Sequence, residues 1–180
     1  YDLLRKTTFL TLCEEALEQI AEACERVTAI VGSPYLTERG AVSAAAVLRK
    51  GRIVDIIEKQ YLTARREMGF IVEGEGYKTI NICGQNVAIM VGNDLAHLSE
   101  IDSKIDFVIN VNSRRYGKGL MSRRLETMRR LSYTQGCSIA IINQVGGSGD
   151  LVYDGTSGIL NKQGQIELIM KSFEEDFAIY

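Results

Sequence analysis

The sequence is short of metal-binding and disulfide-forming side chains. It contains one histidine, His97, and four cysteines among its 180 residues. The cysteines stand at positions 13, 24, 83 and 137, so they form no CxxC pair and no Cys/His group with the spacing of a zinc site. We therefore expect no metal site, and free thiols of the kind found in the reducing cytoplasm.

A strong net charge and long apolar segments are also missing. The formal net charge is -2, which gives no electrostatic attraction for nucleic acid. No apolar run approaches the roughly 20 residues that a membrane-spanning helix needs. We therefore expect neither nucleic acid nor a membrane as a partner. The composition, 46% hydrophobic and 24% charged, is typical of a soluble globular protein.

No low-complexity linker, internal repeat or domain boundary interrupts the chain. Its length is that of one domain with a substantial core, which predicts a single domain over residues 1–180. The sequence begins at Tyr1 rather than at a methionine, and no signal-like segment precedes the first expected helix. We therefore expect a piece of a longer protein.

Hydrophobic periodicity predicts strands that are interleaved with two amphipathic helices. The helices are expected at residues 10–27 and 118–133. The expected strands are 27–31, ending at Gly32 and Pro34, then 44–48, 52–57, 86–91, 106–110 and 138–143. Lys50-Gly51 predicts a hairpin turn between the second and third of them. This order favours an α/β fold with a mixed sheet.

The most informative motif runs from residue 143 to residue 157 and reads NQVGGSGDLVYDGTS. After an apolar strand, its glycines and acidic turn predict a functional loop, followed by a short strand and a second turn. The segment FEED follows at residues 173–176. Together these motifs resemble the glutaminase domain of glutamine-dependent NAD synthetases, a branch of the nitrilase, or carbon-nitrogen hydrolase, superfamily. The resemblance implies a nitrilase-like αββα sandwich with a mixed sheet.

Chemistry of this kind needs a thiolate nucleophile, a carboxylate that transfers protons and a lysine that stabilises negative charge on oxygen. The resemblance implies that Lys59 is the lysine, although a lysine that ends an apolar strand can also be a solvated edge residue. Glu67 matches a supporting glutamate, while another placement of the gap aligns Ala64 there. The resemblance implies that the general base lies on a strand before Tyr1, so we expect it outside residues 1–180.

The resemblance implies that a glycine stands at the position of the nucleophile. Where the family has Cys-Glu-Asp after an apolar strand, this chain has Gly92-Asn93-Asp94. Gly84 fixes the alignment on the other side of the strand, and Cys83 lies at the opposite strand end, roughly 30 Å away at the rise of a β-strand. Because Gly92 offers no attacking atom, we expect the chain not to hydrolyse glutamine.

Glutamine recognition is expected after the strand at residues 106–110. The resemblance implies that Asn112, Ser113 and Lys118 bind glutamine, although the Ser-Pro pair of the family is missing. Arg114 and Arg115 add charge that can hold a carboxylate, and a solvated basic loop is the open alternative. The helix that follows has arginines in adjacent pairs, which predicts a solvated face or an oligomer contact for residues 123, 124, 129 and 130.

The resemblance implies the part of an amidotransferase, classed as a ligase, that releases ammonia from L-glutamine for NAD biosynthesis. Nothing resembles the Ser-Gly-Gly-x-Asp-Ser pyrophosphate loop, so ATP and Mg are expected only in the synthetase domain, and no cofactor is expected in residues 1–180. The expected partners are the synthetase domain and further copies of the chain. Two alternatives stay open: a non-catalytic scaffold beside an ammonia-dependent synthetase, and a general amidase or carbamoylase, which the paired motifs disfavour.

Overall fold

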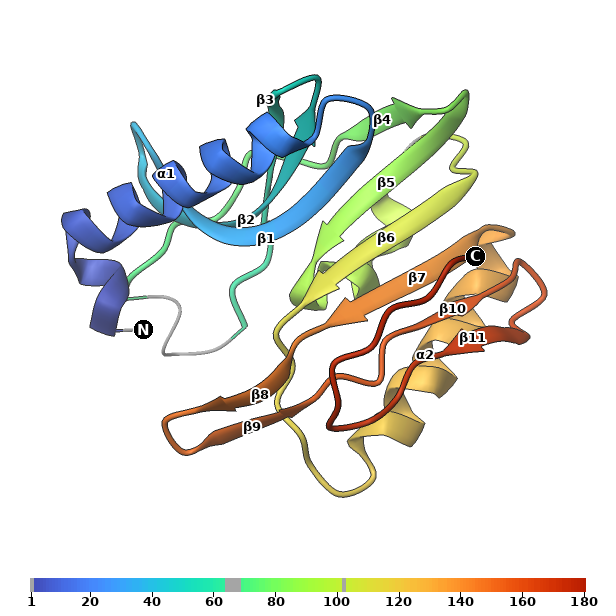
Figure 1. Cartoon of the computed structure of the whole chain (residues 1–180). Helices are drawn as coiled ribbons and strands as arrows, with labels where there is room; N and C mark the ends of the chain where they lie inside the picture. The colour runs from blue at the N-terminus through green and yellow to red at the C-terminus, as the bar shows by residue number, and fades with distance from the viewer. Residues whose placement is uncertain (1, 64–68, 102) are drawn as a thin grey trace. The chain divides into compact units, whose positions relative to one another are not determined.

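The computed structural model describes residues 2–63, 69–101 and 103–180. Within them the chain forms two compact units, Tyr1–Lys78 and Thr79–Tyr180, each with strands and helices (Figure 1). The predicted α/β class is confirmed. Glu67 and its alternative Ala64 lie outside the described residues. The expectation of a single domain stays a prediction.

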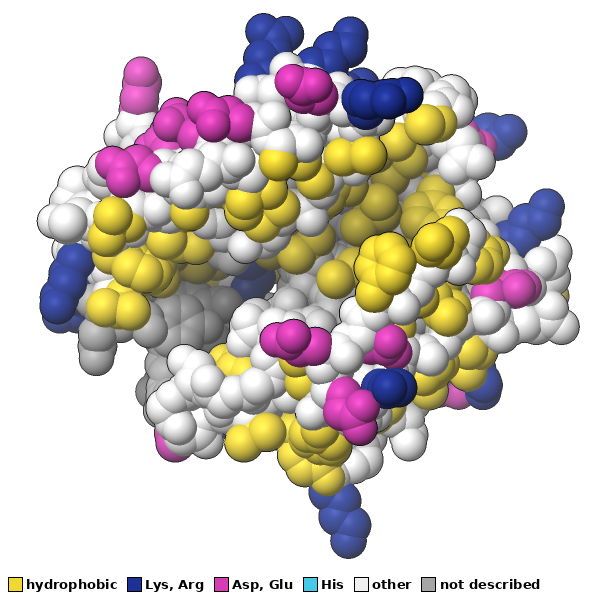
Figure 2. All heavy atoms as spheres, viewed as in Figure 1, with side chains coloured by type: hydrophobic (Ala, Val, Ile, Leu, Met, Phe, Trp, Pro, Cys, Tyr) yellow, Lys and Arg dark blue, Asp and Glu magenta, His cyan; other side chains and the backbone are white. Residues whose placement is uncertain are grey.

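Unit 1 packs a helix against a three-stranded antiparallel sheet. The elements are η1 (Asp2–Arg5), α1 (Thr7–Ala23), β1 (Thr28–Thr37), β2 (Gly40–Arg49) and β3 (Arg52–Glu58), and the strand order is β1-β2-β3. The helix lies along one face of this sheet (Figure 1). Its buried side chains Leu17 and Ala21 pack with Leu48 of β2. Acidic side chains gather on its outer surface (Figure 2).

The first strand is longer than the sequence predicts. We expected it to end at Gly32 and Pro34, but β1 continues to Thr37, with Pro34 opposite Ser43 of β2. The expectation was wrong because β1 is a terminal strand of its sheet, where a missing backbone N–H breaks no ladder on the outer side. The predicted hairpin between β2 and β3 is confirmed, with φ of 54° at Lys50 and 73° at Gly51.

Unit 2 is built on a six-stranded mixed sheet with the order β11-β10-β7-β6-β5-β4. The strands β5 (Gln85–Val91), β6 (Phe107–Asn112) and β7 (Ser138–Asn143) run parallel to one another. The flanking strands β4 (Thr79–Ile82), β10 (Gly158–Leu160) and β11 (Ile166–Ile169) pair antiparallel. The mixed sheet and the three central strands are therefore as predicted, with bounds that differ by two residues or fewer.

Two helical segments follow central strands of unit 2. The nine-residue 3₁₀ segment η2 (Gly92–Glu100) comes directly after β5, and α2 (Leu120–Gln135) connects β6 to β7. The helix α2 is shifted by two residues from its predicted bounds because Gly119 and Gly136 stop it, with φ of 76° and 64°. Among the described residues, no helix is long and apolar enough to cross a membrane.

The segment with the Val-Gly-Gly run is a hairpin. The short strand expected after the loop is confirmed as β9 (Leu151–Asp154). The expected loop is itself a strand, β8 (Val145–Ser148), which pairs antiparallel with β9. The expectation was wrong because glycines contribute no side chain, so the period-two alternation that marks a strand is invisible in this sequence. The hairpin leaves the end of β7 and extends beyond the six-stranded sheet (Figure 1).

The packing of α1 can be tested with two leucines of the same helix. Leu17 is 2% exposed and Leu12 is 57% exposed. We expect Leu17→Ala to lower the free energy of unfolding by about 2–5 kcal/mol through lost burial and the cavity left behind. Leu12→Ala should change it by less than about 0.5 kcal/mol. Chemical denaturation measures both, and equal losses would contradict the assigned inner face of α1.

Candidate functional site

The carboxyl ends of the three parallel strands meet at one edge of the unit 2 sheet. Val91 of β5 pairs with Val111 of β6, and Asn112 of β6 pairs with Asn143 of β7. The residues that follow these strands are therefore neighbours in space. In open α/β sheets this edge is where ligands bind. Three predicted site residues, Gly92, Asn112 and Ser113, lie along it.

Gly92 forms the turn from β5 into η2. Its φ of 59° lies in the left-handed region, where an L side chain costs about 1 kcal/mol or more. Asn110 of β6 is 1% exposed, and its side chain contacts this turn. Its amide Nδ2 donates to the carbonyl oxygen of Met90 at 3.1 Å and to the carbonyl oxygen of Gly92 at 3.2 Å. The backbone is thus firmly positioned at Gly92. Cys83 lies before the start of β5, at the opposite strand end, as predicted.

The segment after β6 carries the residues predicted to bind glutamine. Asn112 is buried, and its Nδ2 donates to the side-chain and backbone oxygens of Asn110 at 2.6 and 3.1 Å. Ser113 and Lys118 are exposed. The backbone N–H of Tyr116 donates to Val152 of β9 at 2.7 Å, so this segment is attached to the β8–β9 hairpin. Ser113 and Lys118 therefore project from an ordered segment.

Asn143 fixes this segment to β7. Its side-chain Oδ1 accepts from the Arg114 backbone N–H at 2.8 Å, and its Nδ2 donates to the Arg114 carbonyl oxygen at 3.2 Å. The same Nδ2 donates to the carbonyl oxygen of Gly155 at 3.0 Å, and the Asn143 backbone N–H donates to Ser157 Oγ at 3.0 Å. One buried asparagine therefore joins three segments. The sequence motif pointed to Asn143, but its partners could not be read from it.

Arg124 forms a buried ion pair with Asp154. Its Nη1 lies 3.2 Å from Asp154 Oδ1, and its Nη2 donates to the Arg115 carbonyl oxygen at 2.9 Å. We expected Arg124 on a solvated helix face, and this was wrong. It lies on the buried face of α2, one and two turns before Met128 and Leu131. The other three arginines of the helix, at positions 123, 129 and 130, are exposed as predicted.

Arg114 is half-buried and contacts amides. Its Nε donates to Asn112 Oδ1 at 3.2 Å, and its Nη2 donates to Asn93 Oδ1 beside Gly92. Burial lowers the pKa of the Arg114 guanidinium, and the charge of Arg124 lowers it further. The guanidinium stays charged all the same, since arginine is not deprotonated in proteins. The two guanidinium groups therefore have different partners: Arg124 is paired with a carboxylate, and the side chain of Arg114 donates to amide oxygens.

Lys59 lies in unit 1, directly after β3. Its backbone N–H donates to the Ser43 carbonyl oxygen at 2.8 Å, and its carbonyl oxygen accepts from Gly74 at 2.8 Å. The residue is 5% exposed. Burial at this level argues against a solvated edge lysine. A buried lysine generally needs partners of its own, and Lys59 has interactions beyond these two backbone bonds.

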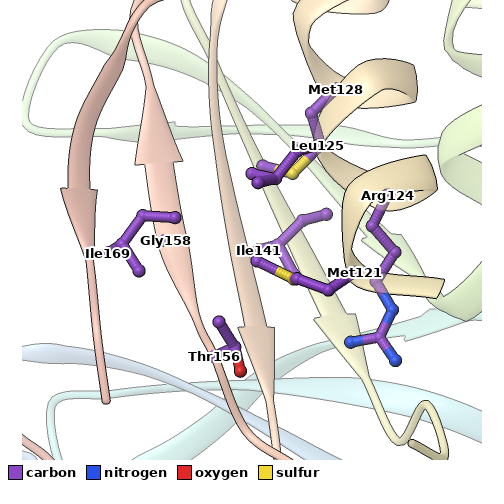
Figure 3. A pocket seen from close by; sticks show the side chains of 8 residues that line it. All are labelled: Met121, Arg124, Leu125, Met128, Ile141, Thr156, Gly158 and Ile169. Carbon is purple, nitrogen blue, oxygen red and sulfur yellow. The ribbon is translucent and has the colours of Figure 1, made fainter. Parts of the chain in front are cut away.

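A small pocket lies between α2 and the strands β7, β10 and β11 (Figure 3). Its walls are mainly apolar, with Met121, Leu125 and Met128 from the helix facing Ile141 and Ile169. The Arg124 guanidinium points toward the end where Thr156 lies (Figure 3). The enclosed space measures only about 10 Å³, which is room for one water molecule at most and not for an organic ligand. This pocket is therefore not the candidate site.

Comparisons with known proteins identify the relatives of this arrangement. A glutamine-dependent NAD(+) synthetase of Aquifex aeolicus is 29% identical over 97% of this chain and 32% of its own length. The structure of the glutamine-dependent NAD+ synthetase from Acinetobacter baumannii, in complex with ADP, superimposes with a TM-score of 0.88 at 27% identity. That match covers 97% of this chain and 35% of the other. No protein-family model matches the chain.

The resemblance to glutamine-dependent NAD synthetases is confirmed. The chain spans about a third of the length of the curated relatives it matches. A carbon-nitrogen hydrolase from Helicobacter pylori has a TM-score of 0.81 at 16% identity, covering 94% of this chain and 68% of its own. The predicted nitrilase-type fold of this NAD synthetase relative is therefore also confirmed.

The buried ion pair gives a direct test of the α2 assignment. Arg124→Met removes the cation and leaves the buried Asp154 carboxylate without a counter-charge, which should lower the free energy of unfolding by about 3–5 kcal/mol. Arg123→Met, at the exposed neighbouring position, should change it by less than about 0.5 kcal/mol. Urea denaturation of both variants measures the difference. Similar stabilities of the two variants would show that Arg124 is solvated after all.

Proposed function

We propose that this chain is the glutaminase-type part of a glutamine-dependent NAD synthetase that has lost glutamine hydrolysis. The assignment to glutamine-dependent NAD synthetases is supported by similarity to enzymes of that name along 97% of the chain. The observation that carries the loss is Gly92, which stands at the carboxyl end of a central parallel strand where the family motif has cysteine. The proposed partners are L-glutamine, the synthetase domain and further copies of the chain.

Hydrolysis of an amide in this way proceeds through a covalent intermediate. A thiolate attacks the amide carbon, ammonia leaves with a proton from the carboxylic acid, and water then releases glutamate. In this proposal Lys59 stabilises the oxyanion, Glu67 supports it, and the general base belongs to the part before Tyr1. Gly92 supplies no atom for the attack, and losing a nucleophile costs several powers of ten in rate.

No step of this chemistry needs a cofactor in residues 1–180. ATP and Mg would act in the synthetase domain, which couples the ammonia to its acceptor. With Gly92 in place, that domain would depend on free ammonia.

The alternative is a non-catalytic scaffold that holds an oligomer and its synthetase partner together. Gly92 favours the scaffold, because a scaffold has no need of a nucleophile. The ordered segment with Ser113 and Lys118 favours instead a former glutaminase that has kept its substrate site. The two proposals differ in glutamine binding. A scaffold has no reason to bind glutamine, and a former glutaminase that kept its recognition segment does.

The first prediction concerns activity. The full-length protein should release no glutamate from L-glutamine above a heat-killed control, because position 92 has no nucleophile. Coupled detection of glutamate with glutamate dehydrogenase measures this. The matched variant Gly92→Cys should gain measurable turnover, while Gly92→Ser, with its much weaker nucleophile, should stay far below it. Turnover by the unaltered protein would refute the proposed loss.

The second prediction concerns binding. The full-length protein should bind L-glutamine in the millimolar range, and Lys118→Ala should weaken the affinity by roughly threefold to tenfold through loss of a charged contact. Isothermal titration calorimetry measures both. Lys162→Ala, an exposed lysine far along the chain, serves as the control and should bind like the unaltered protein. Absence of heat at millimolar glutamine would favour the scaffold.

A further inference from the structure

The Arg114 side chain spans two neighbouring strand ends of the candidate site. Its backbone is fixed, because the Asn143 side chain hydrogen-bonds both the Arg114 N–H at 2.8 Å and the Arg114 carbonyl oxygen at 3.2 Å. From this anchored position the Arg114 Nε donates to Asn112 Oδ1 at 3.2 Å, and Nη2 donates to Asn93 Oδ1. Asn112 ends β6, and Asn93 directly follows Gly92 after β5. The guanidinium therefore lies between the carboxyl ends of β5 and β6.

The guanidinium already uses the donors with which it could grip a ligand. Nε and Nη2 lie on one side of the planar group and form a fork that can bind a carboxylate through two parallel hydrogen bonds. Both donors of this fork are directed at neutral amide oxygens of the protein. In this position Arg114 fills the edge of the sheet without offering the fork to a ligand.

Arg114 also contacts a residue that the sequence predicts to bind glutamine. Asn112 is 8% exposed, and its Nδ2 donates to the backbone and side-chain oxygens of Asn110 at 3.1 and 2.6 Å. The Asn112 Oδ1 accepts from Arg114 Nε. The nitrogen and the oxygen of the Asn112 amide thus both have partners within the protein. An amino-acid ligand would compete with Arg114 for the Asn112 oxygen.

The Arg114 side chain is held by hydrogen bonds and not by an ion pair with a described carboxylate. The nearby Asp154 is paired with Arg124 at 3.2 Å. Burial, and after it the charge of Arg124, lowers the pKa of the Arg114 guanidinium. The charged group is therefore less stable at this edge than in water. Hydrogen bonds within a protein add only modest net stability, so a ligand can displace this side chain.

We propose that Arg114 is a built-in block of the candidate site: its guanidinium occupies the edge between β5 and β6 and must leave before an amino-acid ligand binds. The ligand class rests on the proposed function, in which L-glutamine binds here, while the block itself rests on the contacts of Arg114. The apparent affinity is then the affinity of the open site multiplied by the fraction of molecules in which the side chain is released. Removing the guanidinium therefore tightens binding, whereas removing a guanidinium that clamps a carboxylate would weaken it.

The sign of the change in affinity distinguishes these two roles. In isothermal titration calorimetry on the full-length protein, Arg114→Ala should bind L-glutamine roughly threefold to tenfold more tightly than the unaltered protein, the effect of about one net hydrogen bond. Arg114→Lys keeps the charge without the fork and should bind with an intermediate affinity. Arg123→Ala removes the same charge from an exposed position of α2 and should bind like the unaltered protein.

Circular dichroism and thermal unfolding check that each variant is folded. If Arg114→Ala does not fold, Arg114→Lys carries the same test. Equal or weaker binding of L-glutamine by the folded variant would overturn the block.

A different result would separate the block from the proposed function. If neither the unaltered protein nor Arg114→Ala binds L-glutamine, the proposed function fails, and the block is judged with butyramide and glutarate, which carry only an amide and only carboxylates. Tighter binding of either probe by Arg114→Ala than by the unaltered protein keeps the block for another ligand. Equal binding by the two proteins, or none by either, overturns it.

Discussion

The parallel pairing of β5, β6 and β7 is the constraint on which the candidate site depends. It brings Gly92, Asn112 and Asn143 to one edge, although 51 positions of sequence separate the first from the last. The Asn143 side chain therefore lies close enough to hydrogen-bond both the backbone N–H and the carbonyl oxygen of Arg114. It also donates to the carbonyl oxygen of Gly155. Removing this amide would free the segment after β6 from the sheet and leave several buried polar groups without partners.

In the proposed function, the turn after β5 keeps the positioning of a catalytic site without the reacting atom. Asn110 holds the Gly92 carbonyl oxygen, and the φ of 59° places the turn in a conformation that costs an L side chain free energy. Enzymes accept such strain where it aims a nucleophile, as at the strand-to-helix turns of other hydrolases. In that proposal, glycine at position 92 relieves the strain and forfeits covalent catalysis. The residue that best suits stability at position 92 would then differ from the residue that activity needs.

Elements that depend on local sequence patterns could be predicted, and contacts between residues distant in the sequence could not. The β7 strand was predicted with its observed bounds because its apolar run is uninterrupted, and the Lys50-Gly51 hairpin followed from its turn residues. The strand β8 was missed because its glycines show no alternation, whereas the short strand β9 was predicted. Arg124 was misplaced because its partner Asp154 is 30 positions away, and charge spacing along a helix does not reveal a buried acceptor on another element. The partners of Asn143 were hidden for the same reason.

The central claim is that position 92 is the vacant nucleophile position of a glutamine site. The most direct measurement is the intact mass of the full-length Gly92→Cys variant after treatment with a chloroketone analogue of glutamine, followed by peptide mapping. The account predicts one adduct on the peptide that contains position 92, formed by displacement of chloride and prevented by excess glutamine, and no such adduct in the unaltered protein. Absence of an adduct at position 92, or equal labelling at Cys83 in both proteins, would contradict it.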